Sequence, residues 1–410
     1  MRFHVMAGGK MELRARWLAA SLVAFVLVGL GGCGGGSGAK ILYAVGVGSP
    51  NVTVFEVSGA GTLTATGSSA STGSAPNVIA IDPLLRFAYV IDSAGGIGAG
   101  GVSQYVMNRS TGVLTVATFS STGGTTGAST PVPTGVNPLA MTVDGTGNFV
   151  FVANQGSSSI SVFSIDQVGG TLTEVKQLPP TTQNCTANQI TPCPLPTSGA
   201  PTALVTSGNM LFVAMTNAGA GSIATYTFNP APATQSVIQV PCPTGPGCLQ
   251  APPASTIAAG TNPTAMAMDS SGKFLFVADS VTNTVAAFSI GSNGQLSAVG
   301  APLAAGTKPV SVSVQRSGNF LYTANQGSNN VSAFSFDSTG ALTAVSGSPY
   351  AAGTSPSYVL TDTSSRFLFV ANRDSNNISV FSISSGALTQ VTDSPFLSPV
   401  INPVALASIN

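Results

Sequence analysis

The sequence is poor in charge, in histidine and in tryptophan. Only 6% of its 410 residues are charged, and it holds 1 His and 1 Trp. Charged residues make up about a quarter of an average soluble protein, so Ser, Thr, Asn and Gly must solvate this surface. The chain has no basic run or stripe, which argues against binding that is driven by the neutralisation of nucleic-acid phosphates.

The remaining composition excludes two structural classes. Hydrophobic residues make up 43% of the chain, which is too much apolar material for a disordered protein. The 48 Gly and 27 Pro are too many for a mainly helical protein. The composition therefore indicates a globular protein that is rich in strands and turns.

Residues 1–32 have the pattern of a bacterial lipoprotein signal peptide. Arg14 and Arg16 precede the apolar run WLAASLVAFVLVGL, which continues into LGGC and ends at Cys33. The alternative is a transmembrane anchor, but the run is shorter than the roughly 20 residues that a spanning helix needs. Either Met1 or Met11 could be the true start.

Cleavage of this signal predicts lipidation of Cys33 and a flexible tether over residues 33–40. Because Gly34 follows Cys33, resemblance to sorted lipoproteins implies an outer membrane lipoprotein that faces the periplasm or the cell exterior. Cleavage also removes His4 and Trp17, so the mature chain has no imidazole. A lipid anchor is then the only expected contact with a membrane.

Four further cysteines form two close pairs, Cys185 with Cys193 and Cys242 with Cys248. In an exported protein this spacing predicts two disulfides. The alternative, a zinc site, is weak because no His is available and neither pair has the C-x₂₋₄-C spacing. We interpret the disulfides as constraints on long loops.

One pattern recurs along the chain. The stretch FVANQGSSSISVFSID at 151–166 returns as YTANQGSNNVSAFSFD at 322–337 and as FVANRDSNNISVFSIS at 369–384. Seven copies align on their first aromatic residues: Tyr43, Tyr89, Phe151, Phe212, Phe276, Tyr322 and Phe369. Each copy predicts two alternating strands, a Gly turn and a short third strand, and each is preceded by a strand that usually starts at Pro.

Seven copies of four short strands predict an all-β fold, a seven-bladed β-propeller over residues 41–410. The chain begins on the second strand of a unit, at Ile41, and ends on a first strand, residues 403–409. Pairing of the C-terminal strand with the N-terminal blade would close the ring and leave no free edge.

The repeated motifs FVAN, YTAN and FVAD, each followed by a strand and a turn of the G-x-L-T kind, resemble the YVTN-type repeats of lactonase-like seven-bladed propellers. That family includes 6-phosphogluconolactonase-like proteins. The resemblance covers nearly all of residues 41–410 and implies, if the chain is an enzyme, a lactone hydrolase.

Repetition separates scaffold from candidate site, because a residue that occurs in most blades is explained by the blade. Scaffold residues at the end of the second strand, where a short amide can bond its own turn, are Asn154, Asn325 and Asn372. Carboxylates that end first strands ahead of tight turns are Asp82, Asp144, Asp269 and Asp362. The turns after first strands share one face with the turns after third strands. Charged residues of this face, which we interpret as a solvated surface, are Arg86, Arg109, Lys273, Arg316, Asp337 and Arg366.

The opposite face is where the copies differ. Three long fourth-to-first-strand loops, 118–136, 176–200 and 238–261, lie there and contain both cysteine pairs. Charges that break the repeat on this face define the candidate catalytic residues Lys308, Arg373, Asp279 and Asp374. Candidate ligand-binding residues beside them are Asp92, Asn137 and Asn262. The alternative is that these are separate solvated charges.

Two functions remain open. The first is binding of a small molecule, a glycan or an envelope protein by a lipid-anchored monomer through its loop-rich face. The alternative is a lactonase, in which Asp279 or Asp374 would act as the base and Lys308 or Arg373 would hold the oxyanion. No cofactor is required, although a Ca²⁺ with Asp and carbonyl ligands could replace the base. A phosphorylated sugar lactone is disfavoured because that face has only two cations.

Overall fold

The computed structural model describes residues 40–93, 99–120, 126–128, 131–177, 194–232, 245–250 and 256–409. The chain divides into two compact units, Met1–Ser37 and Gly38–Asn410. The predicted signal peptide (1–32) and Cys33 lie outside the described residues. Within the described ranges, no helix is long and apolar enough to cross a membrane.

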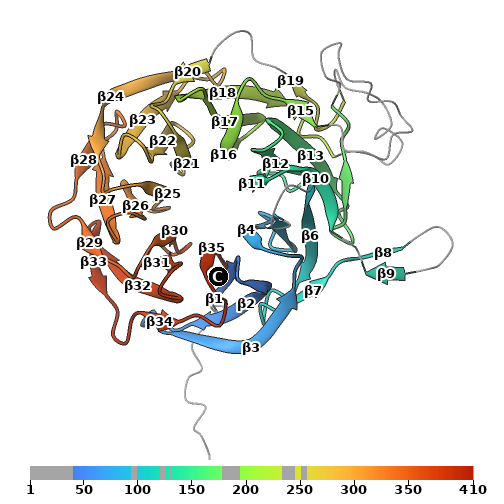
Figure 1. Cartoon of the computed structure of the whole chain (residues 1–410), viewed down its shortest axis with the longest axis horizontal. Coiled ribbons are helices and arrows are strands. Elements are labelled where there is room, and N and C mark those ends of the chain that lie inside the picture. Colours follow the sequence, from blue (N-terminus) through green and yellow to red (C-terminus); the bar gives the residue numbers. More distant parts are fainter. Residues whose placement is uncertain are drawn as a thin grey trace, which may run out of the picture. The chain divides into compact units, whose positions relative to one another are not determined.

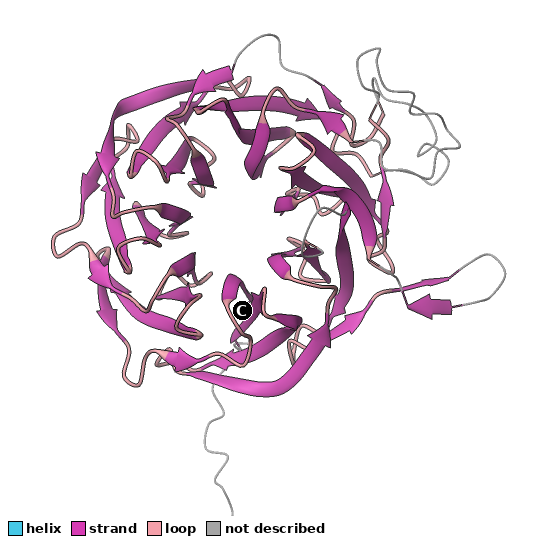
Figure 2. Cartoon of the chain, viewed as in Figure 1, coloured by secondary structure: helices cyan, strands magenta, loops and turns pink. Residues whose placement is uncertain are grey.

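The second unit is a seven-bladed β-propeller, as predicted. Seven antiparallel sheets are arranged around a central axis, with one strand of each sheet innermost (Figures 1 and 2). The inner strands are β4 (Pro76–Ile81), β11 (Pro138–Val143), β16 (Ala200–Ser207), β21 (Pro263–Met268), β25 (Pro309–Val314), β30 (Pro356–Thr361) and β35 (Pro403–Ile409). Six of these seven strands begin at a proline, whose missing N–H is tolerated on an edge strand.

Each inner strand pairs with a second strand, and the second strand pairs with a third. The second strands are β1 (Lys40–Gly46), β5 (Phe87–Asp92), β12 (Phe149–Asn154), β17 (Met210–Asn217), β22 (Phe274–Asp279), β26 (Phe320–Asn325) and β31 (Phe367–Asn372). The third strands are β2 (Ser49–Val57), β6 (Ala99–Met107), β13 (Ser159–Ile165), β18 (Ala220–Phe228), β23 (Thr284–Ile290), β27 (Asn330–Phe336) and β32 (Asn377–Ser384).

The outermost position of each blade is more varied. Two blades carry one long outer strand, β3 (Leu63–Ser71) or β24 (Leu296–Ala304). In the other five, two short strands pair with the third strand: β7 (Leu114–Val116) and β10 (Val132–Val136), β14 (Leu172–Glu174) and β15 (Leu195–Pro196), β19 (Leu249–Gln250) and β20 (Thr256–Ala258), β28 (Leu342–Ala344) and β29 (Tyr350–Ala351), and β33 (Ala387–Gln390) and β34 (Phe396–Leu397). A separate hairpin joins β8 (Thr118–Ser120) to β9 (Thr126–Ala128).

The ring closes as the sequence predicts. The C-terminal strand β35 pairs antiparallel with β1, with Ile41 opposite Ile409 and Tyr43 opposite Ala407. The sheet order β3–β2–β1–β35 therefore combines both ends of the propeller in one blade. Lys40 adds an ion pair to the preceding blade, because its Nζ lies 3.1 Å from Oδ2 of Asp362.

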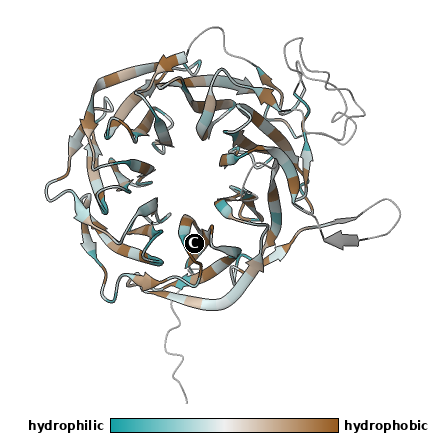
Figure 3. Ribbon diagram, viewed as in Figure 1, coloured by the Kyte–Doolittle hydropathy of each residue, from teal (hydrophilic) through white to brown (hydrophobic). Residues whose placement is uncertain are grey.

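The core lies between neighbouring blades. The second strands are buried along most of their length, and β12 along all of it, so that side chains on both faces pack against an adjacent sheet. Phe151 of β12 packs against Phe228 of the next blade, with ring centroids 4.9 Å apart. Hydrophobic and hydrophilic residues alternate along the more peripheral strands (Figure 3), as expected where one face is solvated.

A repeated contact fixes three blades to the next blade on the face of the first-to-second-strand turns. The Tyr89 hydroxyl donates to the carbonyl of Gly170, 3.0 Å away in the following blade. Gly170 has φ +73°, and a Cβ there would lie 2.3 Å from the Phe87 ring. Tyr43 and Tyr322 make the same bond to glycines of their own following blades.

The turn carboxylates confirm their predicted role. Oδ1 of Asp144 accepts the N–H groups of Asn148 and Phe149 at 2.8 and 2.7 Å. The same pair of bonds recurs at Asp82, Asp269 and Asp362. These four residues therefore cap the turns between inner and second strands and do not form an acid/base array.

Candidate functional site

The loop-rich face has a rim, which we define as the seven residues that precede the prolines of the inner strands: Ala75, Asn137, Ala200, Asn262, Lys308, Ser355 and Asn402. Five of them adopt a left-handed φ between 51° and 55°. In six blades the rim carbonyl accepts an N–H from the turn after the second strand of the same blade. This bond holds the fourth-to-first-strand loops and the second-to-third-strand turns together on one face.

The repeated asparagines fasten this face together. Oδ1 of Asn154 accepts the Gly135 N–H at 3.0 Å, and its Nδ2 donates to Ser161 Oγ at 3.0 Å. Asn372 makes the equivalent pair of bonds to Gly353 and Ser379. Their scaffold role is confirmed, and the amide also bonds across its own turn as predicted, since Asn372 Nδ2 donates to Asn377 Oδ1 at 2.8 Å. The amide bridges the incoming loop to the third strand, a contact between distant residues that the repeat does not reveal.

Lys308 lies on the rim with its side chain exposed. Its backbone is held from two blades, because its N–H donates to Asn283 Oδ1 at 2.7 Å and its carbonyl accepts the Gln326 N–H at 2.9 Å. Within the described residues its ammonium group makes no ion pair. Lys308 therefore presents a cation to solvent from a fixed backbone position.

Arg373 and Asp374 lie on the neighbouring blade and contact each other. Arg373 Nε is 2.8 Å from Asp374 Oδ1, and the two side chains are 40% and 43% exposed. Hydrogen bonds from Arg373 and from the Ser355 hydroxyl hold the pKa of Asp374 below its usual range. The pair thus combines an ionised carboxylate with the guanidinium of a partly exposed arginine.

Asp279 is placed differently. It is 3% exposed, and its two oxygens accept four backbone N–H groups: those of Thr261 and Asn262 on Oδ2 and those of Val281 and Thr282 on Oδ1. Burial raises the pKa of this carboxyl, but the four hydrogen bonds outweigh burial and leave the pKa below its usual value. This geometry gives Asp279 a structural task, and its catalytic role stays a prediction.

Asp92 occupies the same position in its own blade but has fewer donors. It is 4% exposed, Ser103 Oγ donates to its Oδ2, and its Oδ1 is buried without a partner. Burial raises the pKa of Asp92, against hydrogen bonds from Ser103 and Gly73. The protonated form is therefore favoured more at this position than at an exposed aspartate.

We expect Asp92→Asn to stabilise the protein at neutral pH by about 1 kcal/mol, because an amide can donate to Ser103 Oγ as Asn154 does to its own serine. The pKa of Asp92 in the folded protein lies above the ordinary 3.8. Ionised Asp92 therefore destabilises the fold only as pH rises above 3.8 and through the raised pKa. The gain in thermal denaturation midpoint should therefore shrink on acidification. Equal stability of the two proteins at pH 7 would contradict this account.

The seven predicted site residues do not converge on one point. Asp279 and Asn262 belong to the blade of β22, and the Asn262 N–H is one of the donors to Asp279. Asn137 donates to Gln155 in the blade of β12, and Asp92 belongs to the blade of β5. Lys308 belongs to the blade of β25, which lies between the blade of Asp279 and Asn262 and the blade of Arg373 and Asp374. Among Lys308, Arg373 and Asp374, the observed contact is the ion pair of Arg373 with Asp374.

Parts of the three long loops lie outside the described residues, as do Cys185, Cys193 and Cys242. Cys248 is described and is 3% exposed, and both predicted disulfides stay predictions. In the described part of the chain, no three His, Cys, Asp or Glu side chains converge as they would around a metal ion.

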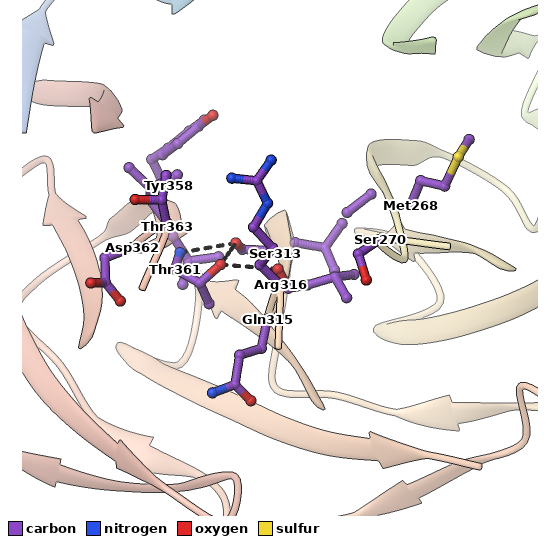
Figure 4. Close-up of a pocket in the computed structure, with 14 residues that line it drawn as sticks. Met268, Ser270, Ser313, Gln315, Arg316, Tyr358, Thr361, Asp362 and Thr363 are labelled. Carbon is purple, nitrogen blue, oxygen red and sulfur yellow. Dashed lines mark hydrogen bonds between the residues drawn. The ribbon is translucent and has the colours of Figure 1, made fainter. Parts of the chain in front are cut away.

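A cavity that the sequence did not predict lies on the opposite face, at the turn ends of β21, β25 and β30 (Figure 4). Its volume is about 440 Å³, within the range of small-molecule sites. Polar side chains that line it include Ser270, Gln315, Arg316, Tyr358 and Thr363. The interpretation of Arg316 as part of a solvated surface is therefore incomplete, because its exposed side chain also borders this cavity.

The comparison with known families agrees with the repeat pattern. The sequence matches the family described as "Lactonase, 7-bladed beta-propeller" over residues 93–188, 247–359 and 312–401. No curated protein matches the chain.

Solved structures share the fold at low sequence identity. A periplasmic gluconolactonase from Pseudomonas aeruginosa is 20% identical with a TM-score of 0.68, and the match covers 91% of this chain and 99% of that one. A protein from Lactobacillus plantarum is 17% identical with a TM-score of 0.67, over 91% and 99% of the two chains. Because the family match spans more than half of the sequence, this chain belongs to the lactonase family of seven-bladed β-propellers.

Proposed function

We propose that this protein is an exported lactonase that opens an unphosphorylated sugar lactone at the loop-rich face. Membership of the lactonase family is the observation that carries the proposal. The sequence alone leads us to expect a binding protein first and a lactonase as the alternative. The family and the fold both favour the lactonase. The lipid anchor and an envelope partner remain predictions from the sequence.

The proposed site consists of Lys308, Arg373 and Asp374. Lactone hydrolysis adds water to the acyl carbon, places negative charge on the carbonyl oxygen and then breaks the bond to the ring oxygen. Lys308 and Arg373 supply cationic donors for that charge. Asp374 orients the attacking water and accepts its proton, which then passes to the departing ring oxygen.

The lowered pKa of Asp374 sets a limit on this mechanism. The carboxylate stays ionised at neutral pH, but a carboxylate of low pKa is a weak base. Most of the acceleration must then come from stabilisation of the oxyanion. Activity that depends on Asp374 should persist on mild acidification and fall only below its ordinary pKa of 3.8.

The charge of the face favours a neutral sugar lactone. Of the two cations in the proposed site, Arg373 is already paired with Asp374, which leaves Lys308 to balance a phosphate dianion. The structural neighbour from Pseudomonas aeruginosa is named a periplasmic gluconolactonase. Together with the lipoprotein-like signal, that name supports an exported enzyme and makes glucono-lactone the first substrate to test.

We expect the double variant Lys308→Ala/Arg373→Ala to lower kcat/KM on glucono-lactone by at least ~10²-fold, the usual loss when an oxyanion donor is removed. Acid release should be measured on unphosphorylated, phosphorylated and acyl lactones, with and without EDTA. Lys273→Ala, an exposed cation of the other face, is the matched control and should retain full activity.

Absence of turnover on every lactone by a folded protein would refute the enzyme and restore the binding function. Equal activity of the double variant and the control would instead keep the enzyme and move its site away from these residues. EDTA sensitivity would add a metal ion to the mechanism.

A further inference from the structure

The cavity on the face opposite the rim coincides with a break in the repeat. At the end of the inner strand, four blades carry the capping aspartates Asp82, Asp144, Asp269 and Asp362. The blade of β25 carries Gln315 instead, followed by Arg316. Compared with those four blades, this turn has an amide in place of the aspartate and a cation at the next residue.

Gln315 keeps the turn folded by other contacts. It is 7% exposed, its Nε2 donates to the Ser365 carbonyl at 2.7 Å, and its Oε1 has no partner. The Ser317 N–H donates to Ser365 Oγ at 2.9 Å. The turn thus depends on the neighbouring blade and needs no carboxylate of its own, so the field of Arg316 is not cancelled from within its turn.

Arg316 is exposed and makes no ion pair within the described residues. Figure 4 shows its guanidinium between Tyr358 and Thr363 on one side and Ser270 on the other. The one carboxylate that lines the cavity, Asp362, is 3% exposed and is matched by Lys40 at 3.1 Å. A net positive potential therefore remains at Arg316.

Neutral hydrogen-bonding groups surround this cation. Thr363 Oγ1 is buried without a partner, although buried hydroxyls nearly always have one. The Tyr358 phenol borders the cavity, and burial raises its pKa so that it stays a neutral donor. Ser313 and Thr361 bond each other at 3.0 Å and complete a polar wall.

We propose that this cavity binds a small carboxylate that also carries hydroxyl groups, of the class to which gluconate belongs. The carboxylate pairs with the Arg316 guanidinium, whose fork of N–H groups suits two oxygens. The ligand hydroxyls bond Thr363, Tyr358 and Ser270, and Met268 and Leu360 supply the apolar part of the wall. The site is distinct from the rim, so it does not depend on the proposed lactonase.

The test is calorimetric titration of the intact protein with gluconate, acetate, glucitol and inorganic phosphate. Gluconate should bind with one site per chain, and at least ~10-fold more tightly than acetate, which lacks the hydroxyls, or glucitol, which lacks the charge. Arg316→Ala should weaken gluconate by at least ~10-fold, and Thr363→Val by a smaller factor.

Two control variants test whether gluconate binds in this cavity. Arg109→Ala removes an exposed cation of the same face outside the cavity and should leave the gluconate affinity unchanged. The Lys308→Ala/Arg373→Ala variant should also keep it, because those residues lie on the rim. Arg316 is exposed, so its replacement should not unfold the protein, and a thermal melt checks this.

Three outcomes would overturn the proposal. The first is the absence of saturable gluconate binding at millimolar concentration. The second is an affinity for gluconate that is the same in Arg316→Ala as in the native protein. Equal affinity of the native protein for phosphate and gluconate counts with it, because either result would show that no specific hydroxy-carboxylate site exists. The third is loss of gluconate binding in the Lys308→Ala/Arg373→Ala variant alone, which would place the ligand at the rim and support the lactonase.

Discussion

Deletion of residues 403–410 should abolish the cooperative folding of the propeller. The deletion removes β35, whose Leu406 and Ile409 are 1% and 2% exposed and which pairs with β1 over Ile41 to Gly46. Burial of two such side chains contributes about 3–6 kcal/mol, and each strand bond about 0.5–1.5 kcal/mol. The sum approaches the whole stability of a typical domain, about 5–15 kcal/mol.

The loss should appear as a broad, non-cooperative thermal transition and as association in size-exclusion chromatography, because β1 becomes an open edge. Deletion of Asn410 alone leaves β35 complete and is the matched control. A truncated chain that stays monomeric and melts as sharply as the control would show that the other six blades hold the ring closed by themselves.

The fold was predictable because the pattern of one blade recurs seven times along the sequence. Tyr43, Tyr89 and Tyr322 recur at one position, and the structure gives each the same bond to a glycine of the next blade. The closure followed from the phase of the repeat, since the chain starts on a second strand and ends on a first strand. A single copy would have predicted strands but neither their number nor the ring.

The site was less predictable. A comparison of the repeats shows which residues depart from the common pattern, but not which groups surround their side chains. Asp92 and Asp279 both replace the common asparagine, so the sequence treats them alike. The structure supplies four N–H donors to Asp279 but leaves one oxygen of Asp92 without a partner, and the two pKa values shift in opposite directions. The difference depends on the course of the incoming loops, at Thr261 and Gly73, which no local pattern encodes.

The break in the repeat at Gln315 and Arg316, though not the cavity beside it, could have been found from the sequence by the same comparison. Gln315 breaks the series of capping aspartates as clearly as Lys308 breaks the rim. The signal was lost because charges near tight turns are usually solvated, and most of those on this face are engaged locally: Arg86, for example, pairs with Asp82 at 2.7 Å. Only the three-dimensional structure shows that the turn of Arg316 borders a cavity between blades.

Asp279→Ala should destabilise the protein by about 3 kcal/mol, because it leaves four backbone N–H groups without their acceptor. Asp279→Asn should lie between the native protein and Asp279→Ala, since an amide offers one oxygen. Urea denaturation at pH 7 measures the difference. The folded pKa of Asp279 is below its ordinary 3.8, so this stabilisation is complete above that value and is lost as pH falls through the lowered pKa.

Asp374→Ala provides the contrast, because this carboxylate is 43% exposed and caps no backbone group that the structure describes. We expect Asp374→Ala to keep the native stability and to lose lactone hydrolysis, whereas Asp279→Ala should lose stability first. If Asp279→Asn is as stable as the native protein but inactive, its carboxylate acts in catalysis and its four hydrogen bonds serve to position it. If Asp279→Ala and Asp279→Asn unfold at the same urea concentration as the native protein, Asp279 does not stabilise the fold by accepting the four backbone N–H groups.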